Sequence, residues 1–338
     1  MRAAPIAVYG ATGHTGRLAA EALAAGEHPV VLGGRDRGAL DQFAARLGSQ
    51  AAPRTAGLED QPGLARLLEG CGVLVNCAGP FVETAAPLIE AALRSRVDYV
   101  DVCAEPLQTV RAFERYDAEA RQRGVTVMPS MSFYFAVGDL LAREVAGGSA
   151  VDAVEVAYWI ENWKMTAASR AAANHVARQP RPTYEGGRLQ VSEPSLTAAS
   201  FSFPQRGETP VITYPGAEPL LIPRHVQTPE VKVWMATEPM ATWSFDAANA
   251  DPGERAESRF TVVAEATRSG RAERSSLRGE DIYLVGARLA AAAAVELTAA
   301  GRPAPGVIGP AEGFELRSLM QSCRTRLGAP QVELQAGG

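Results

Sequence analysis

The chain has 338 residues, of which 46% are hydrophobic and 21% are charged, and its formal net charge at pH 7 is −5. This composition is typical of a globular protein that is long enough for two domains of ordinary size. A negative charge without any basic run argues against nucleic-acid binding, and no segment approaches the roughly 18 uninterrupted apolar residues of a membrane span.

The N-terminal segment and the cysteines favour a cytoplasmic protein. Residues 1–5 lead straight into an apolar strand, without a separate hydrophobic region or cleavage site, so we expect no signal peptide. Cys71, Cys77, Cys103 and Cys323 show neither disulfide nor metal-ligand spacing. We therefore expect a reducing cytoplasmic location and no bound metal.

The first 130 residues alternate strands and helices, which is the pattern of a doubly wound parallel sheet. We expect strands near residues 5–9, 29–33, 50–54, 73–77, 98–102 and 125–128. Helical patterns lie between them, at about 15–25, 37–47, 59–69, 83–96 and 107–123. Glycines stand at or just past the ends of four of these helices, as C-caps do: Gly26, Gly48, Gly70 and Gly124. The count and order predict a complete Rossmann domain.

Beyond about residue 150 the pattern changes to alternating strands, such as 151–160 and 231–236, with loops rich in Pro, Gly and Ser. This part also contains a helical pattern over residues 166–178, and it is followed by a long apolar helix over 281–300. The predicted fold class is therefore α/β: a Rossmann doubly wound parallel sheet, with a second α+β domain built on a mostly antiparallel sheet. The last helix is long enough to return to the first domain.

A glycine-rich loop, Gly10-Ala-Thr-Gly-His-Thr-Gly16, joins the first strand to the first helix. Gly10 allows a tight exit from the strand, Gly13 lets the backbone approach a pyrophosphate, and Gly16 lets the helix pack close to the sheet. The bare N–H groups at the start of this helix would face the anion. Three further loop residues are therefore predicted to bind the cofactor: Thr12, His14 and Thr15. The alternative is that the glycines serve packing alone.

The second predicted strand ends in Gly34-Arg35-Asp36. Dinucleotide folds place at this point either an acidic residue on the ribose 2′-OH or a cation on a 2′-phosphate. Because Arg35 comes first, the sequence predicts NADP(H) as the cofactor. A solvated surface charge is the alternative interpretation of Arg35.

The fourth strand runs into Asn76-Cys-Ala-Gly-Pro80, at the carboxyl edge of the sheet where open α/β folds bind ligands. We expect this loop to line the nicotinamide half of the cofactor, with contributions from Asn76, Ala78, Gly79 and Pro80. The Asn76 amide can fix the loop or reach a ribose hydroxyl, and Pro80 starts the next helix. Cys103, at the tip of the fifth strand, is expected to face the same site. An ordinary strand-to-helix turn is the alternative.

These motifs resemble those of the saccharopine dehydrogenase-like oxidoreductases, a family that includes saccharopine reductases and trans-acting enoyl reductases. The resemblance covers nearly the whole chain and also rests on Gly279-Glu-Asp-Ile-Tyr283 and Pro305-Gly-Val307. It implies an NADP-binding domain of residues 1–132, completed by 282–338, and a middle domain of 133–281 that holds the substrate and the dimer contact. Residues 129–134 and 165–169 depart from the family pattern, so the family's known substrates are not carried over.

The proton that complements a hydride needs a donor, and two residues are candidates. Tyr134 follows the sixth strand and is expected at the substrate, although a buried structural tyrosine is the more common case. His175, in the predicted helix of the middle domain, could reach the nicotinamide or lie on an exposed face.

Other polar and aromatic residues have open roles. Asp101 and Glu105 could orient the substrate or the cofactor amide, or cap the next helix. Tyr158, Trp159 and Trp163 could build an apolar substrate wall, or pack in the core.

Two other enzyme classes fit less well. A short-chain dehydrogenase needs a tyrosine four residues before a lysine, but the only lysines, Lys164 and Lys232, follow Ile160 and Thr228 at that spacing. A thiolate nucleophile would have to be Cys103, for which the sequence places no histidine base.

The sequence thus predicts an NADPH-dependent reductase that transfers hydride to a C=N, C=C or C=O bond of a small metabolite. The alternative is a non-catalytic NADP(H)-binding sensor or scaffold protein. Exposed strands in the middle domain could pair with a second copy, so we expect a homodimer.

Overall fold

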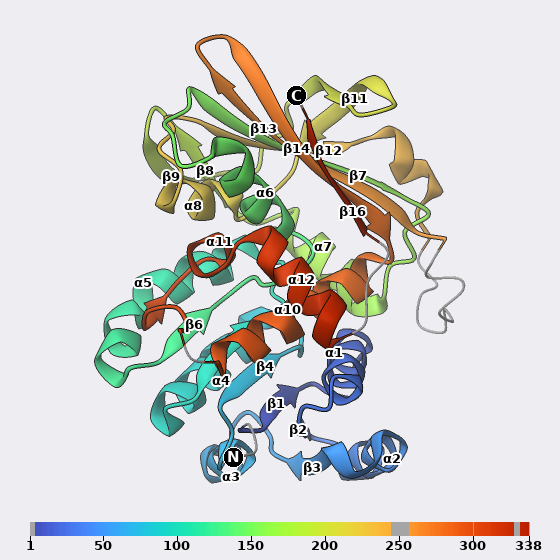
Figure 1. The fold of residues 1–338 in the computed structure, drawn as a ribbon, viewed down its shortest axis with the longest axis vertical. Coiled ribbons are helices and arrows are strands. Elements are labelled where there is room, and N and C mark those ends of the chain that lie inside the picture. Colours follow the sequence, from blue (N-terminus) through green and yellow to red (C-terminus); the bar gives the residue numbers. More distant parts are fainter. Residues whose placement is uncertain (1–3, 245–256, 300, 328–331, 338) are drawn as a thin grey trace. The chain divides into compact units, whose positions relative to one another are not determined.

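The structure is a computed structural model that describes residues 4–244, 257–299, 301–327 and 332–337. The chain divides into two compact units. The first unit comprises Met1–Cys103, Arg111–Phe133 and Tyr283–Pro330, and the second comprises Ala104–Val110, Tyr134–Ile282 and Gln331–Gly338. Each unit is built around its own sheet (Figure 1).

The first unit contains a seven-stranded sheet in the order β15-β6-β5-β4-β1-β2-β3. Every neighbouring pair in this sheet is parallel. The strands are β1 (Ile6–Tyr9), β2 (Val30–Gly34), β3 (Ala51–Thr55), β4 (Val73–Asn76), β5 (Asp98–Asp101), β6 (Thr126–Met128) and β15 (Gly306–Val307). The chain reverses its order of strands between β1 and β4, and this reversal is the place where open α/β sheets bind ligands.

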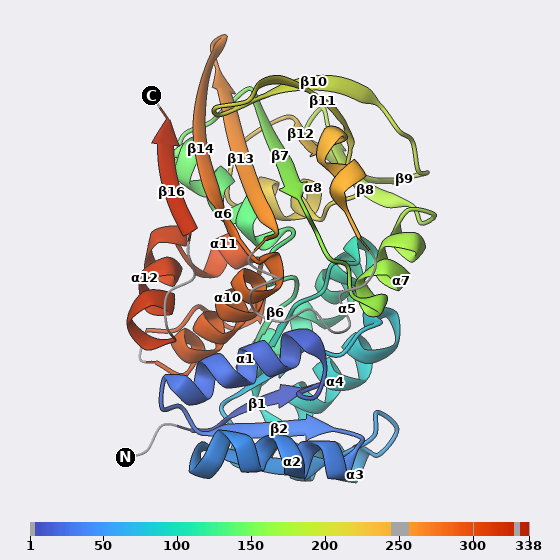
Figure 2. The same cartoon turned by 90° about the vertical axis from the view of Figure 1, so that its right-hand side faces the viewer.

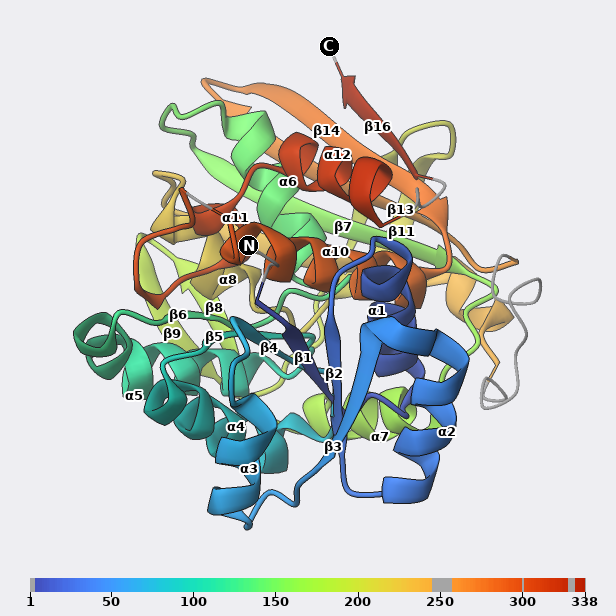
Figure 3. The ribbon, with the colours of Figure 1, turned by 60° about the horizontal axis from the view of Figure 1, so that its bottom comes forward.

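Helices cover both faces of this sheet. The helices described in this part of the chain are α1 (His14–Ala25), α2 (Arg37–Leu47), α3 (Gln61–Leu68), α4 (Phe81–Ser95), α5 (Pro106–Arg123), α10 (Ile282–Leu297), α11 (Pro310–Gly313) and α12 (Leu316–Arg326), with a 3₁₀ turn η1 (Gly48–Gln50). Helices α3, α4 and α5 share one face (Figure 3). Helix α10 packs against α1 through Ala287 and Leu18.

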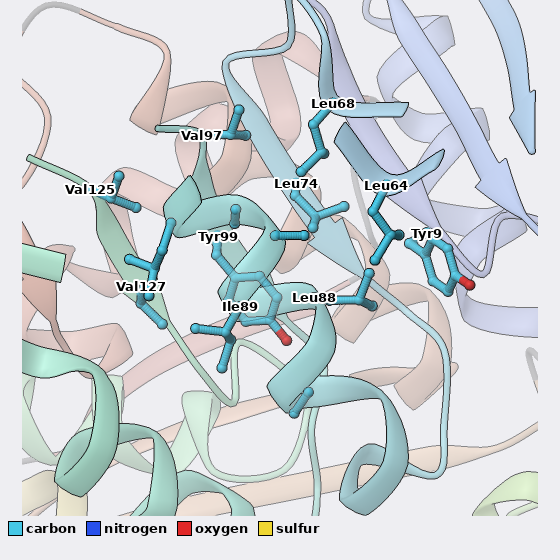
Figure 4. Close-up of a cluster of buried hydrophobic side chains, with 14 of the residues drawn as sticks. Tyr9, Leu64, Leu68, Leu74, Leu88, Ile89, Val97, Tyr99, Val125 and Val127 are labelled. Atoms are coloured by element: carbon cyan, nitrogen blue, oxygen red, sulfur yellow. The ribbon is translucent and has the colours of Figure 1, made fainter. Parts of the chain in front are cut away.

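The core under α3, α4 and α5 is a cluster of buried apolar side chains (Figure 4). Leu64 and Leu68 of α3 and Leu88 of α4 lie over Leu74 of β4, and Tyr99 of β5 is fully buried beside them. The strands read as short continuous apolar runs because both faces of a parallel sheet are covered. Each such buried side chain contributes roughly 1.5–3 kcal/mol to the free energy of unfolding.

The second unit contains a nine-stranded sheet whose main path is β10-β11-β12-β7-β13-β14-β16, with β8 paired to β12 and β9 (Figure 2). Among the strands that the structure describes here, only β7 and β12 pair in parallel, and the other pairs are antiparallel. The strands are β7 (Ala153–Glu161), β8 (Arg181–Glu185), β9 (Arg188–Ser192), β10 (Ala198–Phe203), β11 (Gly207–Thr213), β12 (Val231–Ala236), β13 (Arg259–Arg268), β14 (Arg271–Glu280) and β16 (Val332–Gly337).

The two faces of this second sheet carry different side chains, because successive residues of a strand point to opposite faces. On β7, Ala157 and Trp159 join an apolar cluster with Phe203. Tyr158 points to the other face, where α6 (Ala136–Ala146) and α8 (Glu218–Leu221) pack. The unit also contains α7 (Ala167–Val176) and the 3₁₀ turns η2 (Ile222–Arg224) and η3 (Glu238–Thr242).

The predicted fold class is confirmed: a parallel Rossmann sheet is combined with a mostly antiparallel second sheet. Helix α6 and strand β15 were not among the predicted elements. The observed division also differs from the predicted boundaries: Phe133 clusters with the first unit, and Ile282 and the segments 104–110 and 331–338 cluster with the second. For the last segment the reason is that β16 extends the second sheet by pairing with β14.

Candidate cofactor site

The glycine-rich loop leaves β1 and enters α1 as the sequence predicts. Gly10 has φ +79°, which glycine adopts without strain, and a Cβ there would lie 2.9 Å from the Cβ and the backbone nitrogen of Ala78. A Cβ on Gly16 would lie 2.8 Å from the carbonyl carbon of Gly10 and closer still to its oxygen. The loop can therefore hold this shape only with glycine at both positions.

The start of α1 is open to an anion. Gly13 is the N-cap and offers no side-chain cap, and the first turn contains no acidic residue. Gly13 is exposed, and Thr12 and Thr15 are half-buried. Neither threonine hydroxyl forms a hydrogen bond within the part of the chain that the structure describes. Unsatisfied N–H groups and the helix dipole favour a phosphate at such a terminus.

His14, the first residue of α1, packs its ring edge-on against Tyr283 of α10, with 4.8 Å between the ring centroids. The imidazole therefore ties α1 to α10. A contribution of His14 to cofactor binding, as predicted, would come through its backbone N–H at the helix start.

Arg35 follows β2 at the same edge of the sheet, and Gly33 of β2 accepts hydrogen bonds from the backbone N–H groups of Gly10 and Ala11, at 3.0 and 3.1 Å. The neighbouring Asp36 is the N-cap of α2 and accepts from the Ala39 N–H at 3.0 Å. Within the described residues the exposed Arg35 forms no ion pair. The cation is thus available for a 2′-phosphate, whereas the acidic side chain already serves the helix.

The loop after β4 is fixed from within. Asn76 is fully buried. Its side-chain oxygen Oδ1 accepts from the Ala78 N–H at 3.0 Å, and its side-chain nitrogen Nδ2 donates to the Tyr99 hydroxyl at 3.1 Å. Gly79 and Pro80 are exposed, and Pro80 precedes α4 as its N-cap instead of lying inside the helix. The Asn76 side chain therefore shapes the loop that Ala78, Gly79 and Pro80 present beside Gly10.

Asp101 joins the tips of β5 and β6. Its carboxylate accepts from the backbone N–H groups of Cys103 at 3.0 Å and Ser130 at 2.7 Å, and from the Tyr99 hydroxyl at 2.9 Å. Ser130 is buried with φ +63°, a conformation that is strained for a residue with a side chain. Cys103 is only 1% exposed. Asp101, whose role the sequence left open, thus fixes the strand tips.

These elements define a class: a Rossmann domain with a glycine-rich loop between its first strand and first helix, and with an exposed arginine after its second strand. The family comparison agrees, since residues 6–128 match the saccharopine dehydrogenase NADP-binding domain. This part of the chain is therefore similar to the NADP-binding domain of saccharopine dehydrogenases, and NADP(H) is the cofactor of the domain. Glycine at positions 10 and 16 lets the loop pack closely on its own backbone and on Ala78, and a tight glycine loop of this kind fits that cofactor.

Curated relatives and a solved structure extend the comparison. The chain is 29% identical over 140 residues to a trans-acting enoyl reductase of Mycobacterium leprae, covering 40% of this chain and 34% of the relative. It is 25% identical over 152 residues to a saccharopine dehydrogenase-like oxidoreductase of Mus musculus, covering 40% and 35%. The matched part thus spans about a third of the length of these relatives.

The solved structure is saccharopine dehydrogenase (L-Glu forming) from Saccharomyces cerevisiae, at a TM-score of 0.62 and 11% identity. The superposition covers 98% of this chain and 100% of the yeast chain. At that identity the likeness shows the fold alone. Among the described residues, no helix has the length and hydropathy to cross a membrane.

The two predicted proton donors lie in different surroundings. Tyr134 is 8% exposed, and its ring packs against those of Tyr158, Tyr214 and Trp163, at centroid distances of 5.4, 5.3 and 5.8 Å. His175 lies in the last turn of α7 and is exposed. Tyr134 is therefore part of a packed aromatic cluster, whereas His175 is on a helix surface.

A buried carboxyl, for which the sequence carries no signal, adjoins this aromatic cluster. Glu218 begins α8, is fully buried, and accepts a hydrogen bond of 2.5 Å from the Tyr158 hydroxyl. Asp139 of α6 is equally buried and pairs with His225 at 2.6 Å. Burial above all, with the charge of Asp139, raises the pKa of Glu218 to about 7, although the Tyr158 hydroxyl and nearby backbone N–H groups oppose the shift.

This pKa makes the stability of the protein depend on pH. The folded state holds the Glu218 proton more tightly than the unfolded state, whose carboxyl has the ordinary pKa of 4.5. The stabilisation is therefore complete below pH 4.5 and is lost as the pH rises through about 7. We expect the free energy of unfolding of Glu218→Gln, relative to wild type, to increase over this range. Urea unfolding of both proteins at a series of pH values measures it, and a pH-independent difference would contradict the raised pKa.

Proposed function

We propose that the protein is an NADPH-dependent reductase that transfers a hydride to a C=N, C=C or C=O bond of a small metabolite. The observation that carries the proposal is the anion-accepting loop of residues 10–16 next to an available Arg35. The match to an NADP-binding domain, and the names of relatives that are oxidoreductases or trans-acting enoyl reductases, support it. When bound, the nicotinamide supplies the hydride.

The protein's own residues are proposed to bind and orient the cofactor. The N–H groups at the start of α1 would hold the pyrophosphate, and Arg35 would hold the 2′-phosphate. The loop formed by Ala78, Gly79 and Pro80, held in shape by Asn76, would line the nicotinamide half. Cys103, at the neighbouring strand tip, is proposed to complete that lining through its backbone, because its side chain is buried.

The proposed reduction also needs a proton donor. We assign Tyr134 as the donor, with His175 as the second candidate. A positioned acid of this kind contributes roughly 10²–10⁴-fold to a rate. Tyr134→Phe is therefore expected to lower turnover by about that factor while leaving the dissociation constant of NADPH unchanged.

The assay for this prediction follows NADPH oxidation with a panel of imines, enones and ketones, and His175→Ala is run in parallel. Unchanged turnover in both variants would show that the proton comes from elsewhere. A wild-type protein that binds NADPH but reduces none of the panel would favour the alternative, an NADP(H)-binding sensor or scaffold.

Arg35 is proposed to set the preference for NADPH over NADH. Arg35→Ala removes the cation that would bind the 2′-phosphate, so we expect the affinity for NADPH to fall by about 1.5–3 kcal/mol, the range for hydrogen bonds to charged groups. The affinity for NADH, which lacks this phosphate, should change little. Isothermal titration with both cofactors measures the difference. Equal weakening of both would refute the assignment, and Arg37→Ala, whose side chain pairs with Asp41, is the control.

A homodimer in the cytoplasm completes the proposal. Its support is the surface of β9, where Leu189 and Val191 lie two residues apart and are 42% and 52% exposed. Strands with exposed apolar residues at a sheet edge are suited to pairing with a second copy.

A further inference from the structure

The chain makes a strained turn directly after Tyr134. Phe135 has φ +71° and ψ −56°, and the Ala136 N–H donates to the Tyr134 carbonyl oxygen at 2.9 Å. These values define a γ-turn with positive φ, a rare conformation for a residue with a side chain. Strain of this kind persists only where the surrounding structure holds it, and it concentrates at functional sites.

Two buried side chains hold this turn. The Phe135 N–H donates to the Tyr158 hydroxyl at 3.2 Å, and that hydroxyl donates to Glu218 at 2.5 Å. Tyr158 lies in the middle of β7 and Glu218 begins α8, so the pair ties the turn to both the sheet and a helix. All three residues are fully buried. The turn is thus anchored through hydrogen bonds in the interior of the second unit.

Two glycines make room for the anchor. A Cβ on Gly138, in the first turn of α6, would lie 2.9 Å from the Tyr158 hydroxyl and 3.0 Å from a Glu218 carboxyl oxygen. A Cβ on Gly216 would come closer still to the other carboxyl oxygen. Two separate segments of the chain therefore have glycine where a side chain would collide with the Glu218 carboxyl.

A buried carboxyl is a costly way to fill a core, because removing it from water is unfavourable and apolar residues of similar volume pack as well. Here the carboxyl orients the one hydroxyl that holds the strained turn, and Tyr134 is the residue that the turn places. The Tyr134 ring also lies against Tyr158 itself, at 5.4 Å.

We propose that Tyr158 and Glu218 are positioning residues for Tyr134: they hold the γ-turn at Phe135 and so fix the ring and hydroxyl of Tyr134 for the reaction. This inference rests on the proposed function. It assigns Tyr158, for which the sequence left a substrate wall and core packing open, to a third role.

The test compares Tyr158→Phe with Tyr214→Phe. Both variants remove one hydroxyl from a ring that packs against Tyr134, but the Tyr214 hydroxyl forms no hydrogen bond within the described part of the chain. Hydrogen exchange, read by mass spectrometry on peptides that contain Phe135, is expected to quicken by about tenfold in Tyr158→Phe and not in Tyr214→Phe. Equal exchange in Tyr158→Phe and wild type would overturn the proposal.

Kinetics supply the second readout. We expect Tyr158→Phe to lower kcat about ten- to a hundredfold with little change in KM, as a misplaced catalytic group does. In a Tyr134→Phe background the same substitution should have no further effect, because it acts through Tyr134. Independent, multiplying effects on kcat would overturn the positioning role.

Glu218 is tested by a matched pair of variants. Glu218→Gln keeps an oxygen that can accept from Tyr158, whereas Glu218→Leu removes it. Exchange at Phe135 should be as slow in Glu218→Gln as in wild type and faster in Glu218→Leu. Equal exchange in the two variants would overturn the role of Glu218. A wild-type protein that binds NADPH but reduces no substrate would overturn the proposed function and the catalytic consequence, while the exchange data would still decide what holds the turn.

Discussion

Gly16→Ala is expected to weaken NADPH binding strongly. The added Cβ would lie 2.8 Å from the carbonyl carbon of Gly10 and 3.0 Å from the Cα of Ala11, and these backbone atoms cannot move independently of the loop. Either the loop shifts or α1 moves away from it, and both displace the N–H groups that would hold the pyrophosphate. Overpacking of this kind costs about 1–3 kcal/mol of stability as well. We expect NADPH affinity to fall by about a hundredfold or more, which is about 2.7 kcal/mol.

Isothermal titration with NADPH measures the affinity, and thermal unfolding measures the stability. Gly57→Ala is the matched control, because a Cβ there meets no atom within 4 Å and the backbone is not in the positive-φ region. That variant should bind NADPH as wild type does. If Gly16→Ala bound NADPH with unchanged affinity, the loop would not be the pyrophosphate site.

Asp101→Ala is expected to destabilise the first unit by about 3 kcal/mol or more. The carboxylate satisfies two buried backbone N–H groups, of Cys103 and Ser130, and the Tyr99 hydroxyl. Alanine would leave these buried donors without the carboxylate that accepts from them. The substitution would also release the strained conformation of Ser130. The tips of β5 and β6 would then lose the group that joins them.

Urea unfolding, followed by circular dichroism, measures this loss. The control is Asp41→Ala, which breaks an exposed pair with Arg37 and should change the free energy of unfolding by less than about 0.5 kcal/mol. A loss of under about 1 kcal/mol in Asp101→Ala would mean that water replaces the carboxylate and that Asp101 is not the structural centre of these tips.

Much of the first unit could be predicted because its signals are local. The strand predicted at 29–33 is observed at Val30–Gly34, and the helix predicted over 37–47 is observed at Arg37–Leu47. The glycine-rich loop works through backbone geometry within seven residues, so its spacing carries the information. Strand β15 was missed because two residues give no periodicity, and it forms only by pairing with β6.

The cluster around Glu218 could not be predicted in the same way. Glu218 and Tyr158 are 60 residues apart, and Asp139 and His225 are 86 apart. A charged residue before a proline, such as Glu218 before Pro219, is typical of a solvated loop. Only the packing of α6 and α8 on the sheet shows that Glu218 is buried. Phe135 likewise carries no turn signal, since its positive φ is imposed by tertiary contacts.

Polar residues at strand tips show the limit of reasoning from position. The sequence placed Asn76 and Asp101 at the ligand-binding edge, where either could have contacted the cofactor. In the structure their side chains bond to Ala78, Tyr99, Cys103 and Ser130, so they shape the loops that carry the site. The position of a residue along the chain predicts which edge of the sheet it lies at, but not which groups its side chain contacts.

We propose that this chain binds NADPH through the loop of residues 10–16 and selects it through Arg35. Titration of the purified wild-type protein with NADPH and with NADH, followed by nicotinamide fluorescence and thermal shift, tests this directly. We expect saturable binding of NADPH at least about tenfold tighter than that of NADH, a difference of about 1.4 kcal/mol. Absence of binding for both cofactors, or equal affinity for the two, would contradict it.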